Sequence, residues 1–115
     1  MTSTTLQRRI LKYVNNQGQT KAIPITVNQF MERGTPDVLI VCFGFTIWIE
    51  CKNPQEEPTP IQRKRLREWT GAGAHAWVIH DTQEDYERFI RQFDAIYDQL
   101  LEAFNRGVRD AFNST

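Results

Sequence analysis

Three charged side chains in this 115-residue chain are spaced so that they could act together: Asp37, Glu50 and Lys52. Asp37 ends the stretch Gly34-Thr35-Pro36-Asp37, and Glu50 and Lys52 flank Cys51 at the end of an apolar run. Because side chains alternate along a strand, Glu50 and Lys52 project from the same face. Two carboxylates held close together repel each other, and a hard divalent cation such as Mg²⁺ relieves that repulsion.

The same residues predict a phosphodiester hydrolysis site. The backbone carbonyl of Cys51 lies between the two functional positions and could be a further oxygen ligand. A bound cation lowers the pKa of water and stabilises negative charge on a phosphate, and Lys52 could orient or deprotonate that water. Alternatively, the acid of such a turn only caps a strand, and Glu50 and Lys52 form a solvated ion pair.

Two β-branched and aromatic runs, Val38–Phe43 and Phe45–Lys52, flank Gly44 and predict a hairpin. If Gly44 and Phe45 form its two-residue turn, Asp37 lies opposite Lys52 and diagonal to Glu50, on one face. A shift of one residue would move Asp37 to the other face. The site therefore depends on the hairpin register.

The other elements follow from hydrophobic periodicity and from helix and turn signals. We expect helices over Thr4–Asn16, from Thr59-Pro60 to about Thr70, and from Thr82 to about Phe112, and strands over Ala22–Val27 and Ala74–His80. Pro24 favours an edge strand or an irregular β segment. Thr82 and Asp85 resemble a capping box, and Gly107 could kink or end the last helix. The predicted fold is α/β, a small mixed β-sheet flanked by helices, in which the helix after Pro60 crosses over to a parallel strand.

The order of these motifs resembles the PD-(D/E)XK nuclease superfamily, and more narrowly the VRR-NUC (virus-type replication–repair nuclease) family. The resemblance rests on five segments: Leu6–Val14, Gly34–Asp37, Ile49–Lys52, Thr59-Pro60-Ile61-Gln62 and the strand from Gly73 to Ile79. It implies a restriction-endonuclease-like core over residues 1–81, with residues 82–115 as a C-terminal helical extension of a single domain.

The resemblance also implies roles for individual residues. Asp37 and Glu50 would be metal ligands, Lys52 the catalytic lysine and Gln62 the helix glutamine of the active site, with Mg²⁺ or Mn²⁺ as cofactor. The chain departs from the family in one respect. Family members often carry a glutamate at the start of the first helix, whereas this chain has Ser3 or its neighbours there and no acid before Glu32. Water or Gln7 could fill that place.

The formal net charge is zero, yet the charges are unevenly distributed. Residues 1–80 carry 10 Lys+Arg and 6 Asp+Glu, and residues 81–115 carry the remaining 4 and 8. We expect Arg63, Lys64 and Arg67 to contact a DNA backbone, with Arg8 and Arg9 as further candidates. The alternative is a solvated helix face.

Other classes of protein are disfavoured. Cys42 and Cys51 are too few for a disulfide framework, and His75 and His80 do not complete a zinc site. No run approaches the ~18 apolar residues that span a bilayer. The N-terminus lacks the pattern of a secretory signal. We therefore expect a soluble cytoplasmic protein of a bacterium or of a phage-infected cell.

The aromatic stripe of the last helix is long for packing on a small sheet, so part of it could pair with a second subunit; intramolecular packing is the alternative. The expected protein is a homodimeric, metal-dependent DNA endonuclease selective for branched DNA, such as Holliday junctions or flaps, in phage or viral replication or repair. A non-catalytic nucleic-acid-binding or interaction module on the same scaffold and a restriction-type endonuclease are the competing interpretations.

Overall fold

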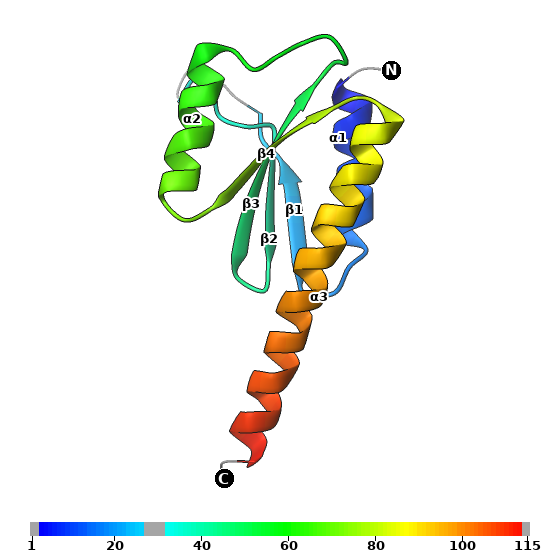
Figure 1. The fold of residues 1–115 in the computed structure, drawn as a ribbon, viewed down its shortest axis with the longest axis vertical. Helices are drawn as coiled ribbons and strands as arrows, with labels where there is room; N and C mark the ends of the chain where they lie inside the picture. Colours follow the sequence, from blue (N-terminus) through cyan, green and yellow to red (C-terminus); the bar gives the residue numbers. More distant parts are fainter. Residues whose placement is uncertain (1–2, 27–31, 114–115) are drawn as a thin grey trace.

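The protein forms one mixed sheet with helices on both faces (Figure 1). The computed structural model describes residues 3–26 and 32–113. In chain order the elements are α1 (Ser3–Asn15), β1 (Thr20–Pro24), β2 (Val38–Cys42), β3 (Phe45–Lys52), α2 (Pro60–Gly71), β4 (His75–His80) and α3 (Gln83–Asn113). The predicted α/β class is confirmed.

The sheet has the strand order β1-β2-β3-β4. The first three strands pair antiparallel, and β4 pairs parallel with β3 after the crossover through α2. β1 lies at the edge, as Pro24 predicted, because a proline has no N–H to donate to a further strand. The expected strand Ala22–Val27 was wrong at both ends, because β1 begins at Thr20 and ends at Pro24, before the described residues Ile25 and Thr26; Val27 lies outside the described residues.

Alternation along the strands sends apolar side chains to the face that α1 and α3 cover. The core on this face contains residues from α1, all four strands and α3: Leu6, Ile10, Val14, Ala22, Val38, Ile40, Ile47, Ile49, Cys51, Ile79, Phe89 and Phe93. α2 lies on the opposite face (Figure 1), where the Trp69 ring packs at a tilt of 40° against Trp48, with ring centroids 4.7 Å apart. Glu50 and Lys52 alternate with the core residues of β3 and so belong to the α2 face.

The hairpin turn differs from the expected one. Cys42 pairs with Phe45, so the turn residues are Phe43 and Gly44 rather than Gly44 and Phe45. Both have positive φ, 52° and 79°, as in the type I′ turn that matches the twist of a hairpin. A positive φ is uncommon for phenylalanine. Here the Phe43 ring lies against Tyr97 and Phe104 of α3, with centroids 5.6 and 5.3 Å away, and these contacts offset the strain.

Moving the turn shifts the pairing of every residue in the hairpin by two positions. Val38 pairs with Ile49, so the continued register sets Asp37 opposite Glu50 and not opposite Lys52. A shift of two keeps each side chain on its face, whereas a shift of one would not. The expected pairing was therefore wrong, but the expected grouping of Asp37 with Glu50 and Lys52 on one face was correct.

The last helix also departs from expectation. The Thr82 hydroxyl accepts the Asp85 N–H at 3.1 Å, but the Asp85 carboxylate binds the His80 N–H instead of completing a capping box. α3 continues past Gly107 to Asn113, so Gly107 does not end it.

Among the described helices, none is both long and apolar enough to cross a membrane. Cys42 and Cys51 are both buried and free.

Candidate active site at the carboxyl end of β3

Asp37 lies immediately before β2, where the pairing of β2 with β3 ends. Its N–H donates to the Ile49 carbonyl at 3.0 Å, and its carboxylate Oδ2 accepts the Cys51 N–H at 2.8 Å. The Asp37 carboxylate thus accepts the Cys51 N–H in place of a backbone carbonyl, at the end of the β2–β3 pairing. The hydrogen bond fixes this carboxylate beside the Glu50-Cys51 peptide.

The backbone of Cys51 has its N–H and carbonyl on the same side of β3, as in any strand. That side faces Asp37, because the Cys51 N–H is bound to the Asp37 carboxylate. The Cys51 carbonyl therefore points to the edge where β2 no longer covers β3. Its position agrees with the role of a hard oxygen donor predicted for it.

Glu50 is buried with its carboxylate between three polar neighbours. Its side chain is 2% exposed; Oε1 lies 3.8 Å from Lys52 Nζ and accepts a hydrogen bond from Gln62 Nε2 at 3.2 Å. Oε2 is buried, and no residue of the described ranges is its hydrogen-bond partner. Burial, together with the charge of the nearby Asp37 carboxylate, raises the pKa of Glu50 to about 8, although Lys52 opposes the shift.

Gln62 is held in place by the first turn of α2. Its side-chain Oε1 accepts the Thr59 N–H at 2.9 Å, and the Thr59 hydroxyl accepts the Gln62 N–H at 3.3 Å, which together make a capping box. With Oε1 engaged, Nε2 is the atom left to donate to Glu50. The cap of α2 therefore orients a side chain of the site.

The turn before Asp37 packs closely on the same end of α2. Gly34 has φ +81°, and a Cβ there would lie 2.9 Å from the backbone oxygen of Ile61. Only glycine accepts both this conformation and this approach. Pro36, next to Asp37, is fully buried. The Gly-x-Pro-Asp stretch and the start of α2 thus pack closely together on one side of the site.

The donor set suits a hard divalent cation that keeps part of its water. Within residues 3–26 and 32–113, no group of three His, Cys, Asp or Glu side chains could hold a metal ion by itself. Two carboxylates and a carbonyl are nevertheless the kind of partial shell that Mg²⁺ uses. Burial and the nearby Asp37 charge raise the pKa of Glu50, and a cation bound by Asp37, Glu50 and the Cys51 carbonyl would offset both effects.

The basic residues of α2 are divided between structural pairs and free charges. Arg63 donates from Nε to the Pro58 carbonyl at 3.0 Å. Arg65 pairs with Glu32 and Glu68 at 2.7 and 2.8 Å. Lys64 and Arg67 are exposed, and the described part of the chain offers their side chains neither an ion pair nor a hydrogen bond. These two remain the most available charges next to Gln62.

The two arginines of α1 have different surroundings. The Arg9 guanidinium lies 3.8 Å above the centroid of the Tyr86 ring and donates to Gln83 at 3.2 Å, which attaches α1 to α3. Arg8 is exposed. The structure therefore gives Arg9 a structural role in the absence of DNA, whereas Arg8 stays a candidate contact.

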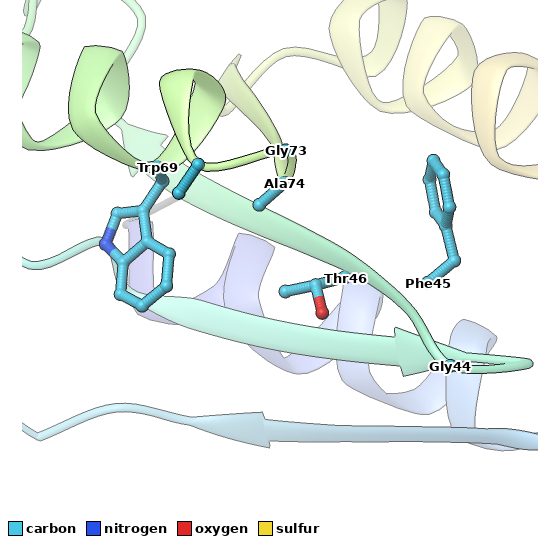
Figure 2. A pocket seen from close by; sticks show the side chains of 7 residues that line it. Gly44, Phe45, Thr46, Trp69, Gly73 and Ala74 are labelled. Atoms are coloured by element: carbon cyan, nitrogen blue, oxygen red, sulfur yellow. The ribbon is translucent and has the colours of Figure 1, made fainter.

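A hollow of about 260 Å³ lies at the opposite end of the sheet, between the β2–β3 hairpin and the end of α2. Figure 2 shows Trp69 and Thr46 beside it, together with glycines 44 and 73. Trp69 is 38% exposed here. The hollow contains no acid and no base, so it has none of the chemistry of the Asp37–Glu50 edge.

Two polar residues lie at the end of β4, His80 and Asp81, and only His80 was considered from the sequence. His80 pairs with Asp85 through Nδ1 at 3.2 Å and with the Glu56 carbonyl through Nε2 at 2.9 Å, which attaches the loop after β3 to α3. Asp81 is buried, 5% exposed, and its N–H donates to the Lys52 carbonyl at 2.7 Å. An acid directly after an apolar strand was the signal that could have identified Asp81.

Comparison with known proteins supports the fold. No protein-family model and no curated protein matches the sequence. Among solved structures, a VRR_NUC domain protein superposes with a TM-score of 0.63 at 20% identity, covering 87% of this chain and 90% of that one. A second VRR_NUC domain superposes with a TM-score of 0.59 at 15% sequence identity, and the match covers 77% of this chain and 90% of that one.

A third solved structure is Hjc from Archaeoglobus fulgidus, a Holliday junction resolvase from an archaeal hyperthermophile. It gives a TM-score of 0.51 at 20% identity, covering 67% of this chain and 65% of that one. At these identities the three comparisons establish that the chain has the fold of VRR_NUC domains, as the sequence predicted.

Proposed function

We propose that this protein is a metal-dependent DNA endonuclease that hydrolyses phosphodiester bonds in branched DNA. The observation that carries the proposal is the group formed by Asp37, Glu50, Lys52 and Gln62 at one edge of the sheet. A surface ion pair would leave Glu50 solvated, whereas here it is buried with one oxygen unpartnered and its pKa raised. Buried acids with shifted pKa values are typical of functional sites.

Each residue has a separate task in the proposed reaction. Asp37, Glu50 and the Cys51 carbonyl would hold Mg²⁺ or Mn²⁺. That cation would lower the pKa of water and neutralise charge on the phosphate. Lys52, held 3.8 Å from Glu50, would orient the attacking water and contact the phosphate. Gln62 would keep the Glu50 carboxylate in a fixed direction through its bond from α2.

The DNA backbone would lie along α2, past the exposed Lys64 and Arg67, with Arg63 close by. Such contacts neutralise phosphates without reading bases. Selectivity for a branched substrate is inferred from the fold shared with VRR_NUC domains and with Hjc, which is named a Holliday junction resolvase. A role in phage or viral replication or repair, in the cytoplasm of the host cell, is part of the same proposal.

Cleavage of labelled DNA tests the activity. Linear duplex, flap and four-way-junction substrates are incubated with Mg²⁺ or Mn²⁺ and with wild type, Lys52→Ala, Asp37→Asn or the control Lys12→Ala, which changes an exposed lysine on α1. We expect wild type and the control to cut the branched substrates, and the two site variants to lose at least about 100-fold in rate. Equal cutting by all four folded proteins, or by none, would contradict the proposal.

A homodimer is part of the proposal, because a junction requires two cuts. Its support is α3, a 31-residue helix whose second half extends beyond the sheet (Figure 1) and exposes 47% of Phe104. The first half of α3 cannot be removed in a test, since Phe89 and Phe93 belong to the core. Light scattering should instead compare the full chain with Phe104→Asp and with a chain ending at Asn105. An unchanged dimer mass in both would remove this half of α3 from the interface.

The competing proposal is a non-catalytic DNA-binding module with the same fold. The absence of an acidic residue in the first turn of α1 favours it. It predicts junction binding that is equal in wild type, Asp37→Asn and Lys52→Ala, with no cleavage by any of them.

A further inference from the structure

The loop of residues 53–58 connects two parts of the proposed active site. It begins directly after Lys52, the last residue of β3, and ends at Thr59, whose N–H donates to the Gln62 side chain in the cap of α2. Pro58 is buried, but residues 54–57 are exposed. The middle of the loop therefore depends on polar contacts for its position, and a movement there would reach both ends of the site.

An open hollow of about 280 Å³ lies beside the end of this loop. Residues of the loop, α2 and β4 line it: Glu57, Pro58, Arg63, Leu66, Val78 and His80. In the β3–β4 pairing, Val78 lies opposite Glu50 and His80 lies opposite Lys52. Paired residues of neighbouring strands share a face, so the hollow and the His80 side chain adjoin the proposed site directly.

His80 contacts the loop with one ring nitrogen and α3 with the other. Nε2 lies 2.9 Å from the Glu56 carbonyl oxygen and 3.4 Å from the exposed Glu57 carboxylate, and Nδ1 lies 3.2 Å from Asp85 Oδ2. Because a carbonyl oxygen only accepts, Nε2 carries the proton of its bond to Glu56. The imidazole thus bridges the loop and α3 next to Lys52.

The other polar contacts of the loop do not replace this one. The Glu56 N–H donates to the Asn53 carbonyl at 3.0 Å, which is a bond within the loop. Arg63 Nε donates to the Pro58 carbonyl at 3.0 Å, which holds only the end of the loop, from α2. Among the described residues, the polar contacts of Glu56 and Glu57 with other elements are those with His80.

The α3 side of the bridge does not depend on the ring. Asp85 Oδ2 also accepts the backbone N–H of His80 at 2.8 Å, and Asp85 Oδ1 lies 3.3 Å from Arg88 Nε. Loss of the imidazole would leave both of these contacts in place, whereas the Glu56 carbonyl would lose its bond to β4. The contact that only the ring can make is the one with the loop.

We propose that His80 is a positioning residue of the active site, which holds the loop of residues 53–58 so that Lys52 and Gln62 keep their places beside Glu50. In this role it needs no contact with the phosphate or with a cation. Misplacement of reacting groups by about 1 Å can reduce a rate by about 100-fold, so one loop contact is enough to affect the chemical step. The inference rests on the proposed function.

Two substitutions test the two ring nitrogens separately. In His80→Gln the side-chain amide nitrogen is as many bonds from Cα as Nε2 is, so it can still donate to the Glu56 carbonyl. In His80→Asn the amide nitrogen corresponds to Nδ1 and can reach only Asp85. In junction cleavage with Mg²⁺, we expect His80→Asn to lower kcat at least about 10-fold with KM within about 2-fold of wild type, and His80→Gln to keep kcat within about 3-fold. The matched control is His75→Asn, which changes the histidine at the other end of β4 and should cut like wild type.

Amide hydrogen exchange without DNA or metal follows the loop independently of cleavage. The N–H groups of Glu56 and Gln62 are bound to the Asn53 carbonyl and to the Thr59 hydroxyl. We expect both to exchange roughly 10-fold faster in His80→Asn than in His80→Gln or wild type, because release of the loop exposes these bonds to water.

The possible results separate this inference from the proposed function. Equal kcat values in His80→Asn and His80→Gln, or equal exchange rates, would overturn the role of His80 and leave the proposed nuclease intact. Failure of either variant to fold would also overturn it, since His80 would then be required by the fold. Absence of cleavage by wild type would overturn the proposed function and this inference together, whatever the exchange rates.

Discussion

Gln62 donates a hydrogen bond to Glu50 across the interface between α2 and β3, from Nε2 to Oε1 at 3.2 Å. The same amide accepts the Thr59 N–H and so belongs to the cap of α2. One side chain therefore begins a helix and fixes the direction of a buried carboxylate. The stability of α2 and the geometry of the site are linked through it.

This link predicts different effects for Gln62→Ala and Thr59→Ala. Both break the capping box and should lower the free energy of unfolding by about 1 kcal/mol. Only Gln62→Ala also frees Glu50, so it should reduce the cleavage rate by 10-fold or more while Thr59→Ala stays within about 3-fold of wild type. Urea unfolding and junction cleavage measure the two quantities. Equal rate losses in the two variants would show that Gln62 acts only through the cap.

The raised pKa of Glu50 predicts that the metal-free protein loses stability as pH rises. A group with a higher pKa in the folded state binds its proton more tightly there, so its contribution is complete below its ordinary pKa of 4.5 and is lost by about pH 8. We expect the free energy of unfolding of wild type to fall by on the order of 1 to 3 kcal/mol over this window relative to that of Glu50→Gln. Urea unfolding with chelator at pH 5, 6.5 and 8.5 measures it. Parallel curves for the two proteins would contradict the shift.

Metal should reverse that trend. Ionised Glu50 binds a cation and protonated Glu50 does not, so stabilisation by excess Mg²⁺ should grow from pH 5 to pH 8.5 in wild type. Glu50→Gln should gain much less at every pH. The measurement is the melting temperature with Mg²⁺ minus that with chelator, and a difference that is independent of pH in wild type would exclude Glu50 as a ligand.

Gly34→Ala should damage both the fold and the site. A Cβ would meet the Ile61 backbone oxygen at 2.9 Å, and alanine rarely adopts φ +81°. We expect a loss of about 2 kcal/mol in the free energy of unfolding, with reduced cleavage because the turn holding Asp37 must move. Gly107→Ala is the matched control: it lies in α3 with open space around it and should stabilise the protein by up to about 1 kcal/mol. Thermal unfolding of both variants checks the contrast.

Lys64 and Arg67 should contribute to DNA affinity through phosphates alone. Lys64→Ala and Arg67→Ala should each weaken binding to every DNA structure about equally, and should each reduce the slope of log affinity against log salt by about 0.9. Arg91→Ala, which changes an exposed arginine on α3, is the control and should leave the slope unchanged. Fluorescence anisotropy at several salt concentrations, with chelator present, gives the slopes. A loss confined to one DNA structure would show recognition beyond the backbone.

The sequence by itself determined the elements and the faces of the strands. Alternation assigned Glu50 and Lys52 to one face, Thr59-Pro60 marked the start of α2, and the motif order predicted the fold that the solved structures share. These features depend on neighbouring residues and on periodicity, which the sequence shows directly. Asp37 joined the correct face despite the wrong turn, because a shift of two residues preserves the alternation.

Tertiary structure decided what depends on contacts between distant segments. The turn lies at Phe43 and Gly44 rather than at Gly44 and Phe45, because α3 provides Tyr97 and Phe104 as contacts for the Phe43 ring. These residues come more than fifty positions later in the chain. The direction of the Gln62 amide follows from its simultaneous contacts with Thr59 and Glu50. The Asp81 carboxylate is buried with no hydrogen-bond partner among the described residues, and no local pattern of the sequence records which partners a buried side chain lacks.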